Sequence, residues 1–159
     1  MRASFPLLQG VFGQALRKAE AIIRGGGSGL EEREIAIRAY FDAWLCGDGR
    51  VLGGLFEEHA DYSESYGPMY HGLAEIERWF LEWNARGKVL RWDIRGFLHD
   101  GARTVVEWYF ENSYDGEWDA FDGVSLVTWG PEGKILSLQE FASRLPHYDP
   151  FAPEYDPNT

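Results

Sequence analysis

Four long segments in the C-terminal half of the chain combine β-branched and aromatic residues, and short turn sequences separate them. This composition favours strands, and turns that hold Gly beside Asp or Pro favour tight reversals of direction. Because each segment follows the previous one after a short turn, the four predict an antiparallel meander. The predicted strands span residues 89–98, 103–114, 118–129 and 134–144.

The chain before residue 89 has the period of helices instead. Apolar residues at helical spacing predict a first helix that ends at Gly47. A short helix over 52–55, an extended piece over 60–66 and a helix over 73–84 follow. Long strands must twist and bend to close over such helices. The sequence therefore predicts an α+β fold, in which a cone-shaped, curved antiparallel β-sheet wraps on three helices.

Residues 1–29 differ from the rest of the chain in pattern and charge. They can form an amphipathic helix followed by a Gly/Ser-rich linker, and their net charge of +3 leaves −14 for the remainder. A docking helix, a membrane-surface or partner-binding segment and an engineered fusion all fit this arm. A capping box from Ser28 to Glu31 marks the start of the folded part. We expect an arm over 1–29, a domain over 30–146 and a tail over 147–159.

The charge and the cysteine content limit the class of protein. A net charge of −11 repels a phosphate backbone or an anionic membrane surface, so we expect no nucleic acid and no membrane as partners. No run reaches the roughly 18 apolar residues of a membrane span. The single cysteine, Cys46, cannot form a disulfide within the chain, and its apolar helical setting predicts a small buried thiol. A cytoplasmic protein fits these features.

Aromatic residues are abundant: they make up 16% of the chain and include seven Trp. Large rings either fill a core or line an opening for a flat ligand. Trp79 and Trp83 belong to a stripe at helical spacing, which by itself favours core packing. In a hollow fold the same rings also line a pocket. We therefore expect a cavity with aromatic walls.

Short motifs occur in a fixed order along residues 31–146. They are Gly-Asp after the first helix, Ala-Asp-Tyr-Ser-Glu-Ser-Tyr-Gly over 60–67, His-Gly before the helix over 73–84, and Gly-Lys-Ile in the last turn. Together with the order of helices and strands, these motifs resemble the nuclear transport factor 2-like superfamily, particularly its ketosteroid isomerase and SnoaL-like branches. The resemblance implies the same α+β cone. It identifies the fold better than the reaction, because one fold hosts many unrelated sites.

The resemblance to ketosteroid isomerase implies roles for three positions. The isomerase's pocket tyrosine matches Tyr40, its general-base carboxylate matches Glu64, and Ser125 replaces its second acid, which donates to the developing enolate. A carboxylate desolvated among rings has a raised pKa and can take a proton from a carbon next to a carbonyl. Tyr40 would hold the oxyanion, with Ser125 as a weaker donor. In the alternative interpretation, Glu64 is a satisfied polar group at the pocket mouth and Tyr40 is a core ring.

Alternation along the strands, carried over from the resemblance, predicts which side chains face the pocket. Glu140 turns inward, either as a second pocket carboxylate or as the ion-pair partner of Arg95, Arg103 or Arg144. Tyr109 and its neighbouring carboxylates turn outward, onto the sheet face that often forms a homodimer interface in this superfamily. The expected ligand-binding residues are Trp79, Trp83, Trp92, Trp108, Phe110, Asn112, Phe121 and Glu140.

Metal and cofactor chemistry find no support in the sequence. The histidines pair neither with one another nor with Cys or carboxylates at metal-ligand spacings, and neither a Gly-rich phosphate loop nor a nucleophile elbow occurs. We therefore expect no metal and no cofactor. The four histidines are His59, His71, His99 and His147.

Three functions remain open for such a domain. It is a small enzyme (an isomerase, cyclase, dehydratase or hydrolase) acting on an apolar carbonyl compound, a non-catalytic binder of an aromatic or polyketide-like molecule, or a scaffold that assembles through its outer sheet face. The number of inward rings favours a small-molecule pocket over a scaffold. An open cavity with converging polar groups would favour the enzyme, a nearly all-apolar cavity the binder, and a filled one the scaffold.

Overall fold

The computed structural model describes residues 29–152, which begin with the long helix α2 (Leu30–Cys46). Its N-cap is Gly29, whose backbone N–H donates to the Glu32 carboxylate. The helix ends at Gly47 in the left-handed region, with φ of 65°. The end is as predicted, but the capping contact joins Gly29 to Glu32, and Ser28 lies outside the described residues.

Three further helical segments follow α2. They are the 3₁₀ turn η1 (Gly49–Val51), the short helix α3 (Leu52–Leu55) and the helix α4 (Leu73–Asn84). The Asp48 side chain caps η1 by accepting from the Arg50 backbone N–H. Helix α4 turns Ile76 and Phe80 into the core. Its predicted bounds match the observed ones.

Six strands form one sheet, and all four segments of the predicted meander are among them. The strands are β1 (Phe56–Ser63), β2 (Met69–His71), β3 (Gly87–Asp100), β4 (Arg103–Tyr114), β5 (Glu117–Trp129) and β6 (Ile135–Arg144). They lie in the order β2-β1-β6-β5-β4-β3. Strand β1 runs parallel to β6, whereas every other pair is antiparallel. The sheet is therefore mixed, which corrects the expectation of a wholly antiparallel one.

The pairing of β1 explains both differences from the predicted strands. Strand β1 starts at Phe56, four residues before the expected extended piece, because its apolar start pairs with Ile135 of β6. The short strand β2 was not predicted, since three residues give no readable alternation. The turn at Gly67 returns the chain so that Tyr70 pairs with Tyr62.

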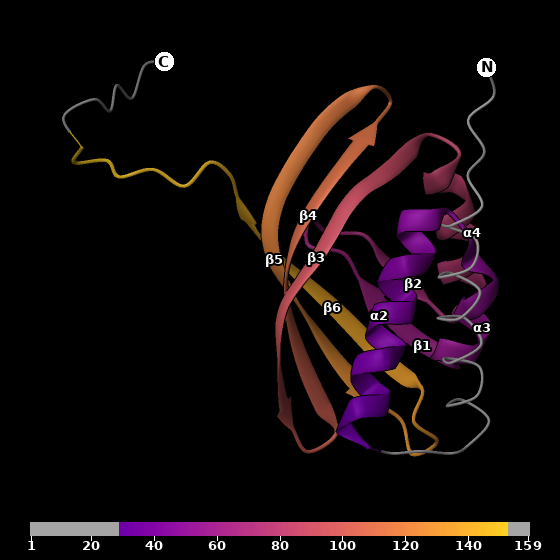
Figure 1. Cartoon of the computed structure of the whole chain (residues 1–159). Coiled ribbons are helices and arrows are strands. Elements are labelled where there is room, and N and C mark those ends of the chain that lie inside the picture. Colours follow the sequence, from indigo (N-terminus) through magenta and orange to yellow (C-terminus); the bar gives the residue numbers. More distant parts are fainter. Residues whose placement is uncertain (1–28, 153–159) are drawn as a thin grey trace, which may run out of the picture.

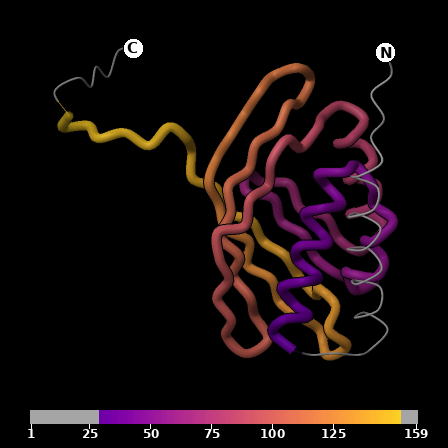
Figure 2. The backbone as a smooth tube through the Cα atoms, viewed as in Figure 1, coloured from indigo at the N-terminus to yellow at the C-terminus, as the bar shows by residue number. Residues whose placement is uncertain are grey.

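The predicted α+β cone is confirmed. Helices α2, α3 and α4 lie on one side of the curved sheet, and the strands bend around them without closing into a barrel (Figure 1). The core fills the space between these layers with residues such as Ile37, Phe41 and Phe56. Cys46 is exposed at the end of α2, which corrects the expectation of a buried thiol. After β6 the chain leaves the body of the domain (Figure 2).

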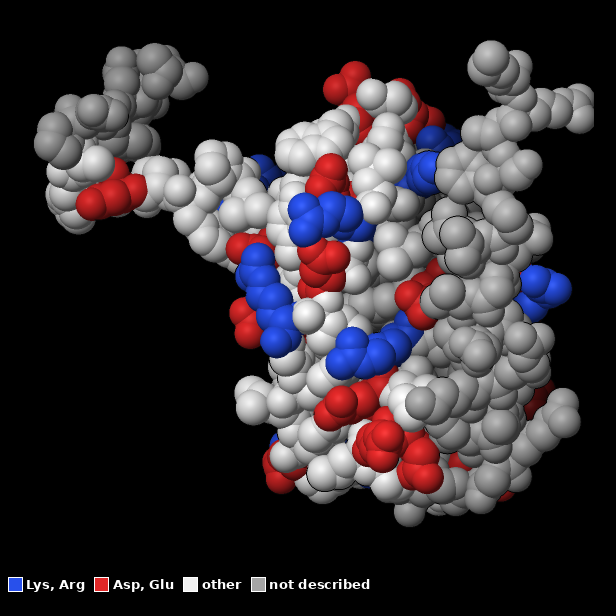
Figure 3. Space-filling view, in the orientation of Figure 1, with Lys and Arg blue, Asp and Glu red and all other residues white. Residues whose placement is uncertain are grey.

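The outward side chains of the sheet are largely paired charges and a few exposed apolar groups. Arg95 forms an ion pair with Asp122 at 2.6 Å, and Arg91 pairs with Asp93 while lying over the Tyr109 ring. Figure 3 shows acidic and basic side chains next to one another on the visible face. Such exposed pairs contribute little to stability but keep the sheet surface hydrated.

The arm and the tail lie mostly outside the described residues. The predicted boundaries of the arm over 1–29 and of the tail over 147–159 stay predictions. Within residues 29–152, no helix combines the length and the apolar character that a membrane span requires.

Close packing of Trp108 on Gly123 fixes the middle of the sheet. The two residues are directly paired between β4 and β5. A Cβ atom at position 123 would lie 2.2 Å from the Trp108 ring and 2.5 Å from the Phe141 carbonyl oxygen. The absence of a side chain at this position therefore lets the ring lie against the strand.

We expect Gly123→Ala to destabilise the fold by about 1–3 kcal/mol, because the ring and the neighbouring backbone must both shift. Urea denaturation measures this loss. The matched control is Gly96→Ala on β3, where a Cβ meets no atom within 4 Å. A Gly123→Ala variant as stable as the control would contradict this account of the packing.

Candidate functional site

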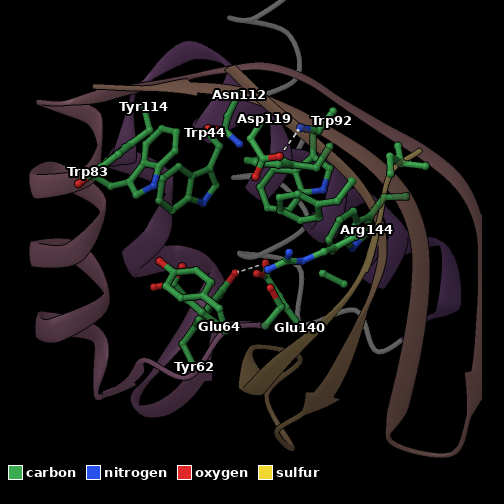
Figure 4. A pocket seen from close by; sticks show the side chains of 18 of the residues that line it. Trp44, Tyr62, Glu64, Trp83, Trp92, Asn112, Tyr114, Asp119, Glu140 and Arg144 are labelled. Carbon is green, nitrogen blue, oxygen red and sulfur yellow. Dashed lines mark hydrogen bonds between the residues drawn. The ribbon is translucent and has the colours of Figure 1, made fainter. Parts of the chain in front are cut away.

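A cavity of ≈ 890 Å³ lies between the helices and the concave face of the sheet. Its walls come from α2, α4, the end of β1, the β1–β2 turn and strands β3 to β6 (Figure 4). Aromatic residues are the commonest kind in the lining, and a few carboxyl, amide and guanidinium groups lie among them. The lining residues are Trp44, Tyr62, Glu64, Ser65, Tyr66, Trp79, Trp83, Trp92, Trp108, Phe110, Asn112, Tyr114, Asp119, Ala120, Phe121, Glu140, Ala142, Arg144 and Leu145.

Glu64 lies in the cavity wall directly after β1, where only 8% of the residue is exposed. Its backbone N–H donates to the Pro68 carbonyl, which fixes the residue at the start of the β1–β2 turn. The Tyr70 hydroxyl donates to its carboxylate at 2.5 Å. Burial raises the pKa of Glu64, and the hydrogen bonds from Tyr70 and Tyr66 oppose that shift only in part.

Glu140 enters the same cavity from β6, at the end where Glu64 lies (Figure 4). It accepts a hydrogen bond from the hydroxyl of Tyr62, a fully buried residue of β1. Burial raises the pKa of Glu140 to about 8, with the Tyr62 hydrogen bond lowering it and the nearby charge of Glu64 raising it further. At neutral pH Glu140 is therefore a protonated carboxyl for most of the time.

The ion-pair interpretation of Glu140 is corrected by these contacts. Arg95 pairs with Asp122, and Arg103 pairs with Asp100. Arg144 also lines the cavity, but within the described part of the chain it forms no ion pair with Glu140. The partner of Glu140 is the Tyr62 hydroxyl and not an arginine. Because a hydroxyl carries no positive charge, it does not compensate the negative charge that Glu140 acquires on ionisation.

The structure brings most of the predicted site residues together around the cavity. Glu64 and all eight expected ligand-binding residues line it: Trp79, Trp83, Trp92, Trp108, Phe110, Asn112, Phe121 and Glu140. Tyr40 and Ser125 do not. Glu64, the candidate base, therefore lies in the cavity wall, whereas its two predicted hydrogen-bond donors lie behind that wall.

Tyr40 and Ser125 are buried within the layers that surround the cavity. Tyr40 is 1% exposed, and its ring lies 6.2 Å from the Tyr62 ring. Ser125 is fully buried, and its oxygen accepts from the Trp108 indole N–H at 2.9 Å. Tyr62 therefore stands between Tyr40 and the carboxyls.

Sequence reasoning missed the hydroxyls that contact the carboxyls. Tyr62 and Glu64 are two residues apart, so alternation along β1 already places them on one face. Tyr70 had no such signal, because it depends on the unpredicted pairing of β2 with β1. Asp119 was also missed, and it lies at the opposite end of the cavity from Glu64 (Figure 4).

The site can support proton transfer. Two carboxyls with raised pKa values lie at one end of a ring-lined cavity, and a tyrosine hydroxyl holds each of them. A carboxyl that is protonated near neutral pH can donate, and one that is ionised can accept. Among residues 29–152 no group of three or more potential ligands is arranged to hold a metal ion.

A family comparison identifies this architecture. The SnoaL-like domain family matches residues 37–138, which include the C-terminal part of α2, all of α4, the carboxyl Glu64 and most of the sheet. The chain belongs to the SnoaL-like domain family. No match was found among curated proteins.

Several solved structures share the fold of this SnoaL-like domain. One, from Catenulispora acidiphila, has a ketosteroid isomerase-like fold and was solved in complex with trimethylamine; it is 21% identical with a TM-score of 0.61 over 68% of this chain and 85% of its own. A nuclear transport factor 2-like protein of unknown function from Burkholderia xenovorans is 19% identical, with a TM-score of 0.62. The match covers 77% of this chain and 91% of that protein. An epoxide hydrolase from M. tuberculosis is 14% identical, with a TM-score of 0.61. The match covers 68% of this chain and 80% of that protein.

These likenesses define the fold and not the reaction, because the identities are low and the named proteins differ in activity. They agree with the predicted fold, and the family match over residues 37–138 confirms the predicted SnoaL-like branch. The chemistry of this SnoaL-like domain must be argued from its own residues.

The raised pKa of Glu140 predicts a pH-dependent stability cost. Below the ordinary Glu pKa both the folded and the unfolded chain bind the proton, whereas between that value and about 8 only the folded chain keeps it. Stability should therefore fall as pH rises through this window, by at most about 1.4 kcal/mol per pH unit. The Glu140→Gln variant lacks this loss.

Urea denaturation of the wild type and Glu140→Gln between pH about 5 and about 8 measures the effect. The difference in unfolding free energy should move in favour of the variant as the pH rises. The control is Glu132→Gln at an exposed turn, which should give one constant difference. A constant difference for Glu140→Gln as well would show that Glu140 ionises normally.

Proposed function

We propose that this SnoaL-like domain binds a small apolar or aromatic carbonyl compound in its cavity, and that Glu64 removes a proton from the carbon next to the carbonyl. The observation that carries the proposal is a buried carboxylate with a raised pKa inside a ring-lined cavity. Aromatic walls bind a flat apolar compound, and desolvation makes the carboxylate a better base.

Glu140 supports this reaction as the hydrogen-bond donor to the enolate oxygen. A carboxyl with a pKa of about 8 is mostly protonated at neutral pH, so it can donate where an ionised one would repel the oxyanion. Tyr62, which contacts Glu140, holds that carboxyl in place. In this arrangement Glu140 takes the part that the family resemblance assigned to the position of Ser125, which lies opposite it on β5.

The second candidate is a binding protein without catalysis. Aromatic rings predominate among the lining residues, and such rings hold an aromatic molecule without any reaction. This observation favours the binding protein. Converging carboxyls at one end of the cavity favour the enzyme over the binder. An open cavity of this size argues against a function as scaffold alone.

Exchange of α-hydrogens for deuterium tests the base without knowledge of the natural substrate. With 2-tetralone in D₂O, the wild type should accelerate exchange, and Glu64→Gln should lower the protein-dependent rate by at least about 100-fold. The rate should rise as Glu64 ionises, above the ordinary Glu range, and fall as Glu140 loses its proton near pH about 8. Proton NMR follows the reaction.

Glu107→Gln, on the outer face of the sheet, is the matched control and should exchange like the wild type. If Glu64→Gln and the wild type accelerate deuterium exchange at equal rates, Glu64 is not the base. Binding of 2-tetralone without accelerated exchange would favour the binding protein instead.

We also propose that the domain forms a homodimer through the outer face of its sheet. Besides the paired charges, this face carries the exposed apolar side chains of Leu98 and Phe141, on β3 and β6. Exposed apolar groups beside paired charges are typical of an interface of mixed polarity.

A charge placed at the centre of that face should separate the protomers. We expect the wild type to sediment as a dimer and Phe141→Glu as a folded monomer, because a buried carboxylate without a partner is costly. Leu81→Glu, at an exposed position on helix α4, is the control and should stay dimeric. A monomeric wild type would refute the proposal.

A further inference from the structure

The end of the cavity opposite Glu64 is a corner of aromatic rings. The Trp44 and Trp83 rings meet at 84° with centroids 5.4 Å apart, and the Tyr114 ring lies 5.5 Å from Trp83. Trp79 lies 4.8 Å from Trp44 but also 4.6 Å from the Tyr70 ring, so it joins the corner to the end where the carboxyls lie. Trp79, Trp83 and Tyr114 are only partly buried, so ring surface there is available to a ligand.

An exposed acidic residue, Asp119, lies beside these rings. Asp119 lines the cavity at this end, beside Asn112, its partner on the paired strand (Figure 4). Within residues 29–152 no ion pair engages Asp119; its side chain accepts from the Ala120 N–H. Arg144 is the only basic residue among those that line the cavity, and Figure 4 shows it toward Glu140.

The rings of this corner already attract a cation in the folded protein. The Arg86 guanidinium lies over the Tyr114 ring at 4.9 Å from its centroid, while it also pairs with Asp115. A ring face attracts cations through its quadrupole, and perpendicular rings present several faces to one point. Trp binds cations best among the aromatic residues, and the corner contains two, Trp44 and Trp83.

We propose that the corner formed by Trp44, Trp83 and Tyr114, with Asp119, is the binding site for an ammonium group of the ligand. The inference rests on the proposed function, because the same ligand reaches Glu64 and Glu140 with its carbonyl part. It deepens that function by naming the substrate class: a carbonyl compound that carries a tertiary or quaternary amine. The amine lies at the ring corner, away from the two carboxyls that handle the proton.

A ligand whose amine binds at the ring corner keeps its positive charge away from Glu140. At the carboxyl end, a ligand cation would add to the positive charge of Arg144 and favour the ionised form of Glu140, which would remove the donor that the reaction needs. At the ring corner the positive charge instead faces Asp119 and the π faces. The overall negative charge of the protein also draws a cation to the cavity.

Two probes of nearly equal shape test the charge itself: choline and its neutral isostere 3,3-dimethylbutan-1-ol. Isothermal titration of the full chain should give choline about tenfold tighter binding than the alcohol. Asp119→Asn should lower the affinity for choline about threefold to tenfold and leave the affinity for the alcohol unchanged. Trp83→Leu should remove most of the preference for choline.

Two controls separate the corner from general effects of charge and ring number. Asp100→Asn removes an exposed acid at the β3–β4 turn, and Trp118→Leu removes an exposed Trp outside the cavity. Neither should alter the preference for choline. Far-UV circular dichroism establishes that each variant is folded.

Several results would overturn the inference. They are equal affinity for choline and the alcohol, no detectable choline binding, or an Asp119→Asn variant that binds choline as the wild type does. Binding and exchange of 2-tetralone, which has no amine, report on the proposed function independently. If 2-tetralone is bound and exchanged while choline is not preferred, the ammonium binding site is refuted and the proposed function stands.

Discussion

The contact of Trp108 with Gly123 sets the inner surface of the sheet. The ring lies against a strand position without a side chain, and its indole N–H donates to Ser125, so both its place and its tilt are fixed. Trp92 and Phe121 pack around it, with ring centroids 5.8 and 5.9 Å away. These three rings form part of the wall of the cavity on the sheet side.

The same contact decides which polar groups face the cavity. Because Ser125 is occupied by Trp108 and lies behind it, the converging polar groups at that end are Glu64 and Glu140. Each carboxyl receives a hydrogen bond from a neutral tyrosine, a weaker compensation than an arginine would give. Burial therefore dominates their pKa values, and this makes the pair suited to proton transfer.

Much of the fold and part of the site followed from local patterns. The meander and the helix over 73–84 were predictable because their side chains alternate or repeat with one clear period. Glu64 followed from a motif, and alternation along the strands sufficed to turn Trp108 and Glu140 inward. The position of Tyr40 behind Tyr62 did not follow, because a motif gives a residue's place in the chain and not what stands in front of it.

The sequence by itself determined the α+β cone, its ring-rich concave face and the presence of Glu64 at the end of the first strand, since these depend on the period of side chains along single elements. Tertiary structure alone decided the parallel pairing of β1 with β6, the tyrosines that hold the carboxyls and the place of Asp119 at the ring corner. The physical reason is that these features join segments far apart in the chain. Their distances arise only when the sheet closes over the helices.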